Sequence, residues 1–172
     1  VSVFGNTHDD TVNVTNVTTG SETTISTGAG SDTVNVGTLA PAAGGTVNRI
    51  AALLTIDGGT HGTTGDALNV DDAGDNAANT GSLSSSTITG LFGAGGSVRY
   101  SALEALNIHL GSAAGAGNTF TIQSTHATAT TLDTQGGADT INVQTLRGET
   151  TVNGGGGADT FTVGSAAPNS GG

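Results

Sequence analysis

The chain has 172 residues, of which 30 are glycine and only 3% are aromatic, and its formal net charge is −11. Phosphate binding needs clustered cations, and three arginines without a lysine do not supply them, so we expect no nucleic-acid partner. There is no cysteine for a disulfide framework, and no run of about 18 apolar residues, so we expect no insertion into a membrane.

Six short phrases, taken in chain order, begin with Asp or Asn and then alternate apolar with polar residues. Alternation with a period of two is typical of a strand with one buried face, and the abundant Thr and Val favour strands over helices. We therefore expect Val34, Val36, Phe161 and Val163 to point inward. The phrases are DTVNV at 10–14, DTVNV at 32–36, DALNV at 66–70, NTFTI at 118–122, DTINV at 139–143 and DTFTV at 159–163.

A second strand is expected shortly before three of these phrases, around Ile25, Leu132 and Val152. A Gly-containing turn separates the two strands each time, which gives a coil of about 20 residues. Stacked coils of this kind form a thin, elongated core from small side chains. The sequence therefore predicts an all-β fold, a parallel β-solenoid (β-helix) with Gly-rich turns.

The centre of the chain is less regular. The segment 53–70 keeps the strand-turn-strand pattern with an insertion around His61, and 86–100 indicates another irregular coil. Ser101 and Glu104 match a helix-capping pattern, so one interpretation of 101–104 is a short helical turn. A strand through Leu106, Ile108 and Leu110 is expected to follow.

A longer repeat is also present. When position 32 is aligned with position 159, the segments 32–45 and 159–172 match at 8 of 14 positions, and the only two prolines coincide. We interpret 1–172 as one continuous solenoid segment with an internal super-repeat whose period is the step from 32 to 159. The super-repeat is 32–158, with 1–31 the end of the previous unit and 159–172 the start of the next.

These phrases resemble the tandem repeats of large secreted bacterial surface proteins and adhesins, which are related to hemolysin-type calcium-binding (RTX) repeats. The segments GGGGADTFTV (154–163) and YSALEALNIHLGSAAGAGNTFTIQSTHA (100–127) carry the resemblance most specifically. It implies a bacterial protein at the cell surface or outside the cell, with a structural role in a fibre, stalk or adhesin shaft. It implies no catalytic activity.

The motifs indicate calcium as a candidate cofactor. The nonapeptide G-G-x-G-x-D-x-U-x binds Ca²⁺ in parallel β-rolls, and 154–162 match it in full. The matching turns elsewhere are incomplete, and DALNVDDAGDN at 66–76 adds a cluster of oxygen ligands. The alternative is that glycine supplies a positive φ and aspartate bonds local backbone. The candidate ligands are Asp159, Asp32, Asp139, Asp66, Asp71, Asp72 and Asp75.

The sequence gives less support to other functions. Glycosidases need two carboxylates across a cleft, and no such pair is evident on one strand face, so we expect no enzyme. The four histidines lack zinc-site spacing. An ice-binding Thr/Asn face and a carbohydrate-active β-helix are further alternatives. The expected partners are neighbouring repeats or identical subunits end to end, with a glycan or cell-surface ligand as another possibility.

Overall fold

The computed structural model describes residues 1–112 and 117–167. These residues form strands, turns and bends. They contain no helix, and therefore no helix that is long and apolar enough to cross a membrane. The expectation of an all-β fold is confirmed.

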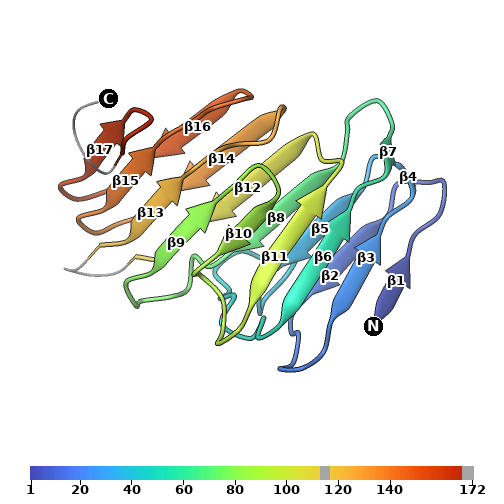
Figure 1. The fold of residues 1–172 in the computed structure, drawn as a ribbon. Helices are drawn as coiled ribbons and strands as arrows, with labels where there is room; N and C mark the ends of the chain where they lie inside the picture. The colour runs from blue at the N-terminus through green and yellow to red at the C-terminus, as the bar shows by residue number, and fades with distance from the viewer. Residues whose placement is uncertain (113–116, 168–172) are drawn as a thin grey trace.

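Most strands belong to two large sheets, which lie against each other as two layers (Figure 1). A third, small sheet pairs β4 (Ala29–Gly30) with β7 (Thr60–His61). Sheet A contains, in spatial order, β1 (Ser2–Phe4), β3 (Thr23–Ser26), β6 (Leu53–Asp57), β11 (Ser97–Ser101), β10 (Thr87–Thr89), β9 (Thr80–Leu83), β13 (Thr119–Ile122), β15 (Thr140–Val143) and β17 (Thr160–Val163). Sheet B contains β16 (Thr150–Asn153), β14 (Ala129–Asp133), β12 (Ala105–His109), β8 (Ala67–Asp71), β5 (Thr33–Val36) and β2 (Thr11–Val14).

The chain passes back and forth between the two sheets, and neighbouring strands within each sheet are parallel with one exception. The exception is β10, which pairs antiparallel with both β9 and β11. After β8 the chain runs out to β9, returns through β10, and reaches β11 beside β6. This excursion is the irregular centre that the sequence indicates.

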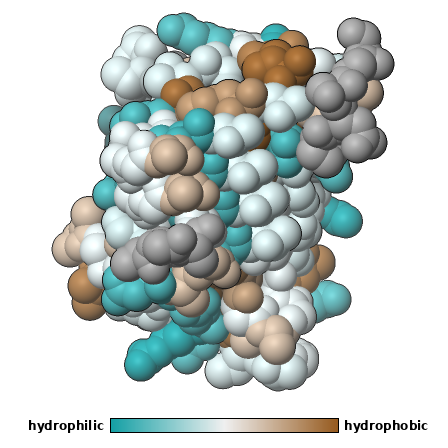
Figure 2. Space-filling model, turned by 90° about the vertical axis from the view of Figure 1, so that its left-hand side faces the viewer, coloured by the Kyte–Doolittle hydropathy of each residue, from teal (hydrophilic) through white to brown (hydrophobic). Residues whose placement is uncertain are grey.

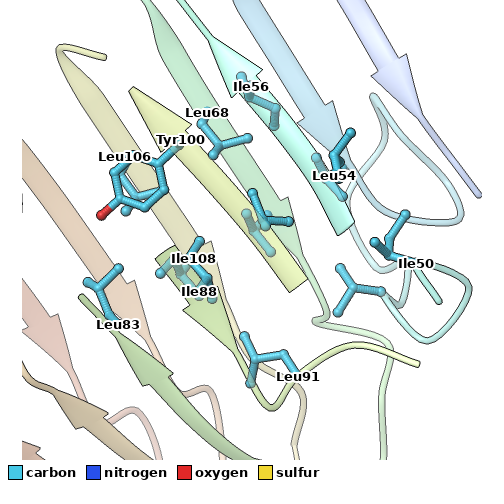
Figure 3. Close-up of a cluster of buried hydrophobic side chains, with 14 of the residues drawn as sticks. Ile50, Leu54, Ile56, Leu68, Leu83, Ile88, Leu91, Tyr100, Leu106 and Ile108 are labelled. Atoms are coloured by element: carbon cyan, nitrogen blue, oxygen red, sulfur yellow. The ribbon is translucent and has the colours of Figure 1, made fainter. Parts of the chain in front are cut away.

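The core lies between the two sheets and combines inward residues of the alternating phrases, such as Leu68, with residues of other strands and turns, such as Ile50 and Leu91 (Figure 3). Val34 and Val36 are almost fully buried, as predicted. Phe161 and Val163 remain 48% and 76% exposed, because β17 is the last strand of sheet A and, among the described residues, pairs only with β15. A correct inward pattern therefore does not ensure burial at the end of a sheet.

The interpretation of 101–104 as a helical turn is wrong. Ser101 is the last residue of β11, and Ala102 has a φ of 51°, in the left-handed region that a right-handed helix excludes. The strand expected next is confirmed as β12, which carries Leu106 and Ile108, and the buried Leu110 follows it directly.

The repeated phrases have the same local geometry but lie in opposite sheets. The N–H of Gly37 donates to the carbonyl of Val14 at 3.0 Å, and the N–H of Gly164, its equivalent in the second copy, donates to Val143 at 2.9 Å. Yet β5 lies in sheet B, whereas its sequence equivalent β17 lies in sheet A. The same exchange relates β3 in sheet A to β16 in sheet B. An odd number of passages between the two sheets separates β5 from β17, and this places the two copies in opposite sheets.

Candidate functional site

Acidic side chains form a ladder at the turns that lead into sheet B. Asp10, Asp32, Asp66 and Glu104 directly precede β2, β5, β8 and β12. Asp32 Oδ1 accepts the backbone N–H of Asp10 at 2.7 Å, and Asp66 Oδ1 accepts that of Asp32 at 2.7 Å. Glu104 Oε2 continues the series by accepting the N–H of Asp66 at 2.8 Å. Asp32, Asp66 and Glu104 therefore each bind the backbone of the preceding turn.

A second ladder runs along the turns that lead into sheet A. Its members are Asn79, Asn118, Asp139 and Asp159, which directly precede β9, β13, β15 and β17. Asn118 Oδ1 accepts the N–H of Asn79 at 3.0 Å, Asp139 Oδ1 accepts that of Asn118, and Asp159 Oδ1 accepts that of Asp139 at 3.0 Å. Four of the seven predicted calcium ligands thus belong to two separate ladders, with Asp32 and Asp66 in one, and Asp139 and Asp159 in the other.

Three of the ladder carboxylates are almost fully buried, whereas Asp10, Glu104 and Asp159 are partly buried. Asp32, Asp66 and Asp139 are each about 1% exposed, and the second oxygen, Oδ2, of each is buried without a hydrogen-bond partner. Burial raises the pKa of Asp66, and the nearby charges of Asp32 and Glu104 raise it further, against the lowering effect of the N–H that Asp32 donates. The ladders therefore contain carboxylates with one satisfied and one unsatisfied oxygen.

Glycine makes room for these carboxylates. A Cβ on Gly154, at the start of the best nonapeptide match, would lie 2.6 Å from Asp159 Oδ2. Gly157, later in the same turn, has a φ of 132°, which side-chain-bearing residues rarely adopt. A backbone role thus accounts for the Gly-rich segment and for Oδ1 of Asp32, Asp66, Asp139 and Asp159. The buried Oδ2 atoms are what a cation could still bind.

The remaining three candidate ligands, Asp71, Asp72 and Asp75, form hydrogen bonds to a segment earlier in the chain. Asp71 Oδ2 accepts the N–H of Gly45 at 2.7 Å, and Asp72 Oδ1 accepts that of Val47 at 2.9 Å. Asp75 Oδ2 accepts the side-chain amide of Asn48 at 3.0 Å. The acidic cluster at the end of β8 and directly after it therefore holds residues 45–48, whose N–H groups donate to its carboxylates.

The pKa values of Asp72 and Asp75 in this cluster are shifted in opposite directions. The pKa of Asp72 is raised to about 7, first by burial and then by the charges of Asp75 and Asp71, although the N–H of Val47 lowers it. Burial also acts to raise the pKa of Asp75, but hydrogen bonds from Ala77, Asn48 and Asn79 outweigh it and lower the pKa. Asp72 is thus the residue of the cluster most sensitive to pH near neutrality.

The structure brings neighbouring ladder members together in pairs, but not into a compact ligand set. Within 1–112 and 117–167, no three His, Cys, Asp or Glu side chains converge on a common point that could hold a metal ion. Binding of Ca²⁺ by the seven predicted aspartates stays a prediction, and the buried Oδ2 atoms of Asp32, Asp66 and Asp139 are the ladder oxygens still available to a cation.

Sequence reasoning missed two ladder members, Glu104 and Asn79. A signal was present for both. Glu104 begins EALNI, which matches DALNV at Asp66, and Asn79 begins NTGSL, which shares its first two residues with NTFTI at Asn118. Alignment of the phrases by their first acceptor side chain would have placed both.

Comparison with known proteins identifies no relative of this chain. No family model matches the chain, and neither the curated proteins nor the solved structures contain a significant match.

Proposed function

We propose that this chain is a segment of a parallel β-solenoid that serves as a structural module of an extracellular fibre, stalk or adhesin shaft. Regular passage of the chain between two sheets supports this, since each pass adds one strand to each layer outside the central excursion. The strands stack in register, so that Val34 has Val12 on one side and Leu68 on the other. In such a rod each coil covers the backbone edge of the previous one, which gives stiffness without a large core.

The observation that carries the proposal is the state of the two outermost strands of sheet A. Among residues 1–112 and 117–167, strand β1 pairs only with β3, and β17 only with β15, so within this part of the chain each has one backbone edge free of strand pairing. Their apolar side chains are exposed, with Phe4 at 76% and Val163 at 76%. Figure 2 views the molecule from the left-hand side of Figure 1, where β17 lies, and shows a surface that is mostly polar or neutral with separate apolar patches. A neighbouring repeat or an identical subunit, stacked end to end, would pair the edges and cover these side chains.

Sedimentation velocity over a range of protein concentrations tests this association. We expect the wild-type chain to form larger species as its concentration rises. The double variant Phe161→Lys/Val163→Lys places two charges on the edge strand and should remain monomeric. Leu39→Lys/Leu146→Lys is the matched control, because these side chains are similarly exposed, 56% and 49%, but lie outside the end strands. A monomeric wild type, or a control that dissociates equally, would refute the end-to-end proposal.

A calcium-dependent module is the second candidate, favoured by the unpartnered Oδ2 atoms of Asp32, Asp66 and Asp139. In this version Ca²⁺ neutralises the ladders and sets the rigidity of the rod outside the cell. Thermal melting in Ca²⁺, in Mg²⁺ and in a chelator tests it, together with calorimetric titration of Ca²⁺. Saturable heat and a higher Tm in Ca²⁺ alone would support it. Identical melting curves without binding heat would eliminate it and leave the structural role intact.

A further inference from the structure

A pocket of about 180 Å³ lies on the outward side of sheet B, between the sheet and the segment that follows β5. Its floor is formed by outward side chains of three neighbouring strands, Asn35 of β5, Asn69 and Asp71 of β8, and His109 of β12. Its wall is the Ala40–Ala43 stretch, which contains Pro41. Two contacts hold the wall segment at its ends, Thr38 N–H to the carbonyl of Thr46 at 2.9 Å and Gly45 N–H to Asp71 Oδ2.

The asparagines of the floor are fixed by one another. Asn69 Nδ2 donates to Asn35 Oδ1 at 2.8 Å, and Asn107 Nδ2 donates to Asn69 Oδ1 at 2.9 Å. A primary amide has two N–H donors, and its oxygen has two lone pairs, so each rung uses only half of its capacity. Asn35 and Asn69 therefore present pre-oriented donors and acceptors at the spacing of adjacent strands.

Asp71 and His109 extend this polar floor. They are direct partners across β8 and β12, and Asp133 of β14 is the next residue in the same row. The imidazole of His109 makes no hydrogen bond or ion pair with any residue in the described part of the chain. One of its ring nitrogens can donate while the other accepts, and the carboxylate of Asp71 accepts. The row therefore suits hydroxyl groups, which both donate and accept.

The opposite wall is apolar, and the pocket is small. A volume of about 180 Å³ is below the roughly 300–1,000 Å³ of sites for drug-sized ligands and leaves space for about one sugar ring. A pyranose has hydroxyls around its rim and C–H groups on its faces, which match the polar floor and the wall of Pro41 and alanines. A net charge of −11 and the carboxylate of Asp71 disfavour an anionic ligand.

From this geometry we propose that the pocket binds a single pyranose residue of a neutral sugar or an amino sugar, and rejects an acidic sugar. The site is built within one copy of the chain, so the proposal goes beyond the structural role and does not depend on it. A ligand of about a dozen non-hydrogen atoms in an open site binds with a Kd on the order of 1–10 mM.

Titration of the ¹⁵N-labelled chain with three probes, followed by NMR, tests the proposal. Methyl α-glucoside is the neutral probe, glucosamine the cationic one and glucuronate the anionic one. We expect saturable shifts of the Asn35 and Asn69 side-chain amides with the first two and none with glucuronate. Absence of saturable shifts with both non-acidic probes overturns the proposal, and so does binding of glucuronate at equal strength.

Variants separate this pocket from nonspecific binding. His109→Ala removes one hydrogen-bonding group and should raise the Kd about tenfold, while Ala42→Trp should fill the pocket and abolish binding. His61→Ala is the matched control, because His61 is exposed and lies outside the pocket lining. Unchanged amide spectra away from the pocket verify that each variant is folded. Wild-type affinity in both folded pocket variants would overturn the assignment.

Discussion

Replacement of Asp32 by Ala and by Asn distinguishes the backbone role of the ladders from a cation-binding role. The Asp32 side chain accepts the N–H of Asp10 at 2.7 Å, and its own N–H is bound by Asp66 at 2.7 Å. Alanine removes the acceptor and leaves the Asp10 N–H without its partner. Asparagine keeps an oxygen at the same place and removes only the charge, as Asn118 does naturally in the sheet A ladder.

The expected magnitudes follow from these contacts. A hydrogen bond to a charged group contributes about 1.5–3 kcal/mol to stability. Relief of the buried charge beside Asp66, whose pKa the Asp32 carboxylate helps to raise, offsets part of that loss. We expect Asp32→Ala to lower the free energy of unfolding by about 2 kcal/mol, which is roughly 4–8 °C in Tm for a chain of this length. Asp32→Asn should stay within about 1 kcal/mol of the wild type.

Urea denaturation and thermal melting, each in a chelator and in Ca²⁺, measure both effects. The reasoning predicts the same order in either buffer, with the wild type and Asp32→Asn close together and Asp32→Ala clearly lower. Equal destabilisation by Asn and Ala would refute it, because the oxygen acceptor would then contribute nothing by itself. A Ca²⁺-dependent gain in Tm that Asp32→Asn abolishes would instead assign the charge to cation binding.

Two further predictions concern the Gly-rich turn and the acidic cluster. Gly154→Ala should destabilise the chain by about 1–3 kcal/mol, because its Cβ would lie 2.6 Å from Asp159 Oδ2. Gly156→Ala is the control and should be tolerated, because no atom lies within 4 Å of the added Cβ. Equal melting temperatures of the two variants would contradict this prediction. Asp72 has a folded pKa of about 7 against an ordinary 3.8, so its contribution to stability is full below pH 4 and is lost as the pH rises through 7. At about 1.4 kcal/mol per pKa unit the loss is at most about 4 kcal/mol, and Asp72→Asn should flatten the dependence of unfolding free energy on pH over that range. A pH profile that keeps its wild-type slope in Asp72→Asn would assign the dependence to other groups.

The functional assignment of the aspartates depended on partners that the sequence does not display. Nonapeptide matching selected Asp159 as the best calcium ligand, yet the structure gives Asp159 and the less well matched Asp32 equivalent hydrogen bonds to the preceding turn. The Asp71–Asp75 cluster suggested oxygen ligands for a cation, whereas its oxygens accept N–H groups from residues 45–48. The backbone donors lie 26 and 25 residues before the carboxylates that bind them, so no local motif could have indicated them.

By itself, the sequence determined the strands of the six phrases and the turns before them, because alternation and glycine placement are local properties that each phrase carries alone. Tertiary structure decided the sheet, the neighbours and the burial of each phrase. The phrase DTVNV occurs at 10–14 and again at 32–36, but Val12 is only partly buried on the edge strand β2, whereas Val34, between two strands, is 2% exposed. The equivalent phrases of β5 and β17 even lie in opposite sheets. Burial is set by the strands stacked above and below, and identical local sequences have different neighbours at different places in the stack.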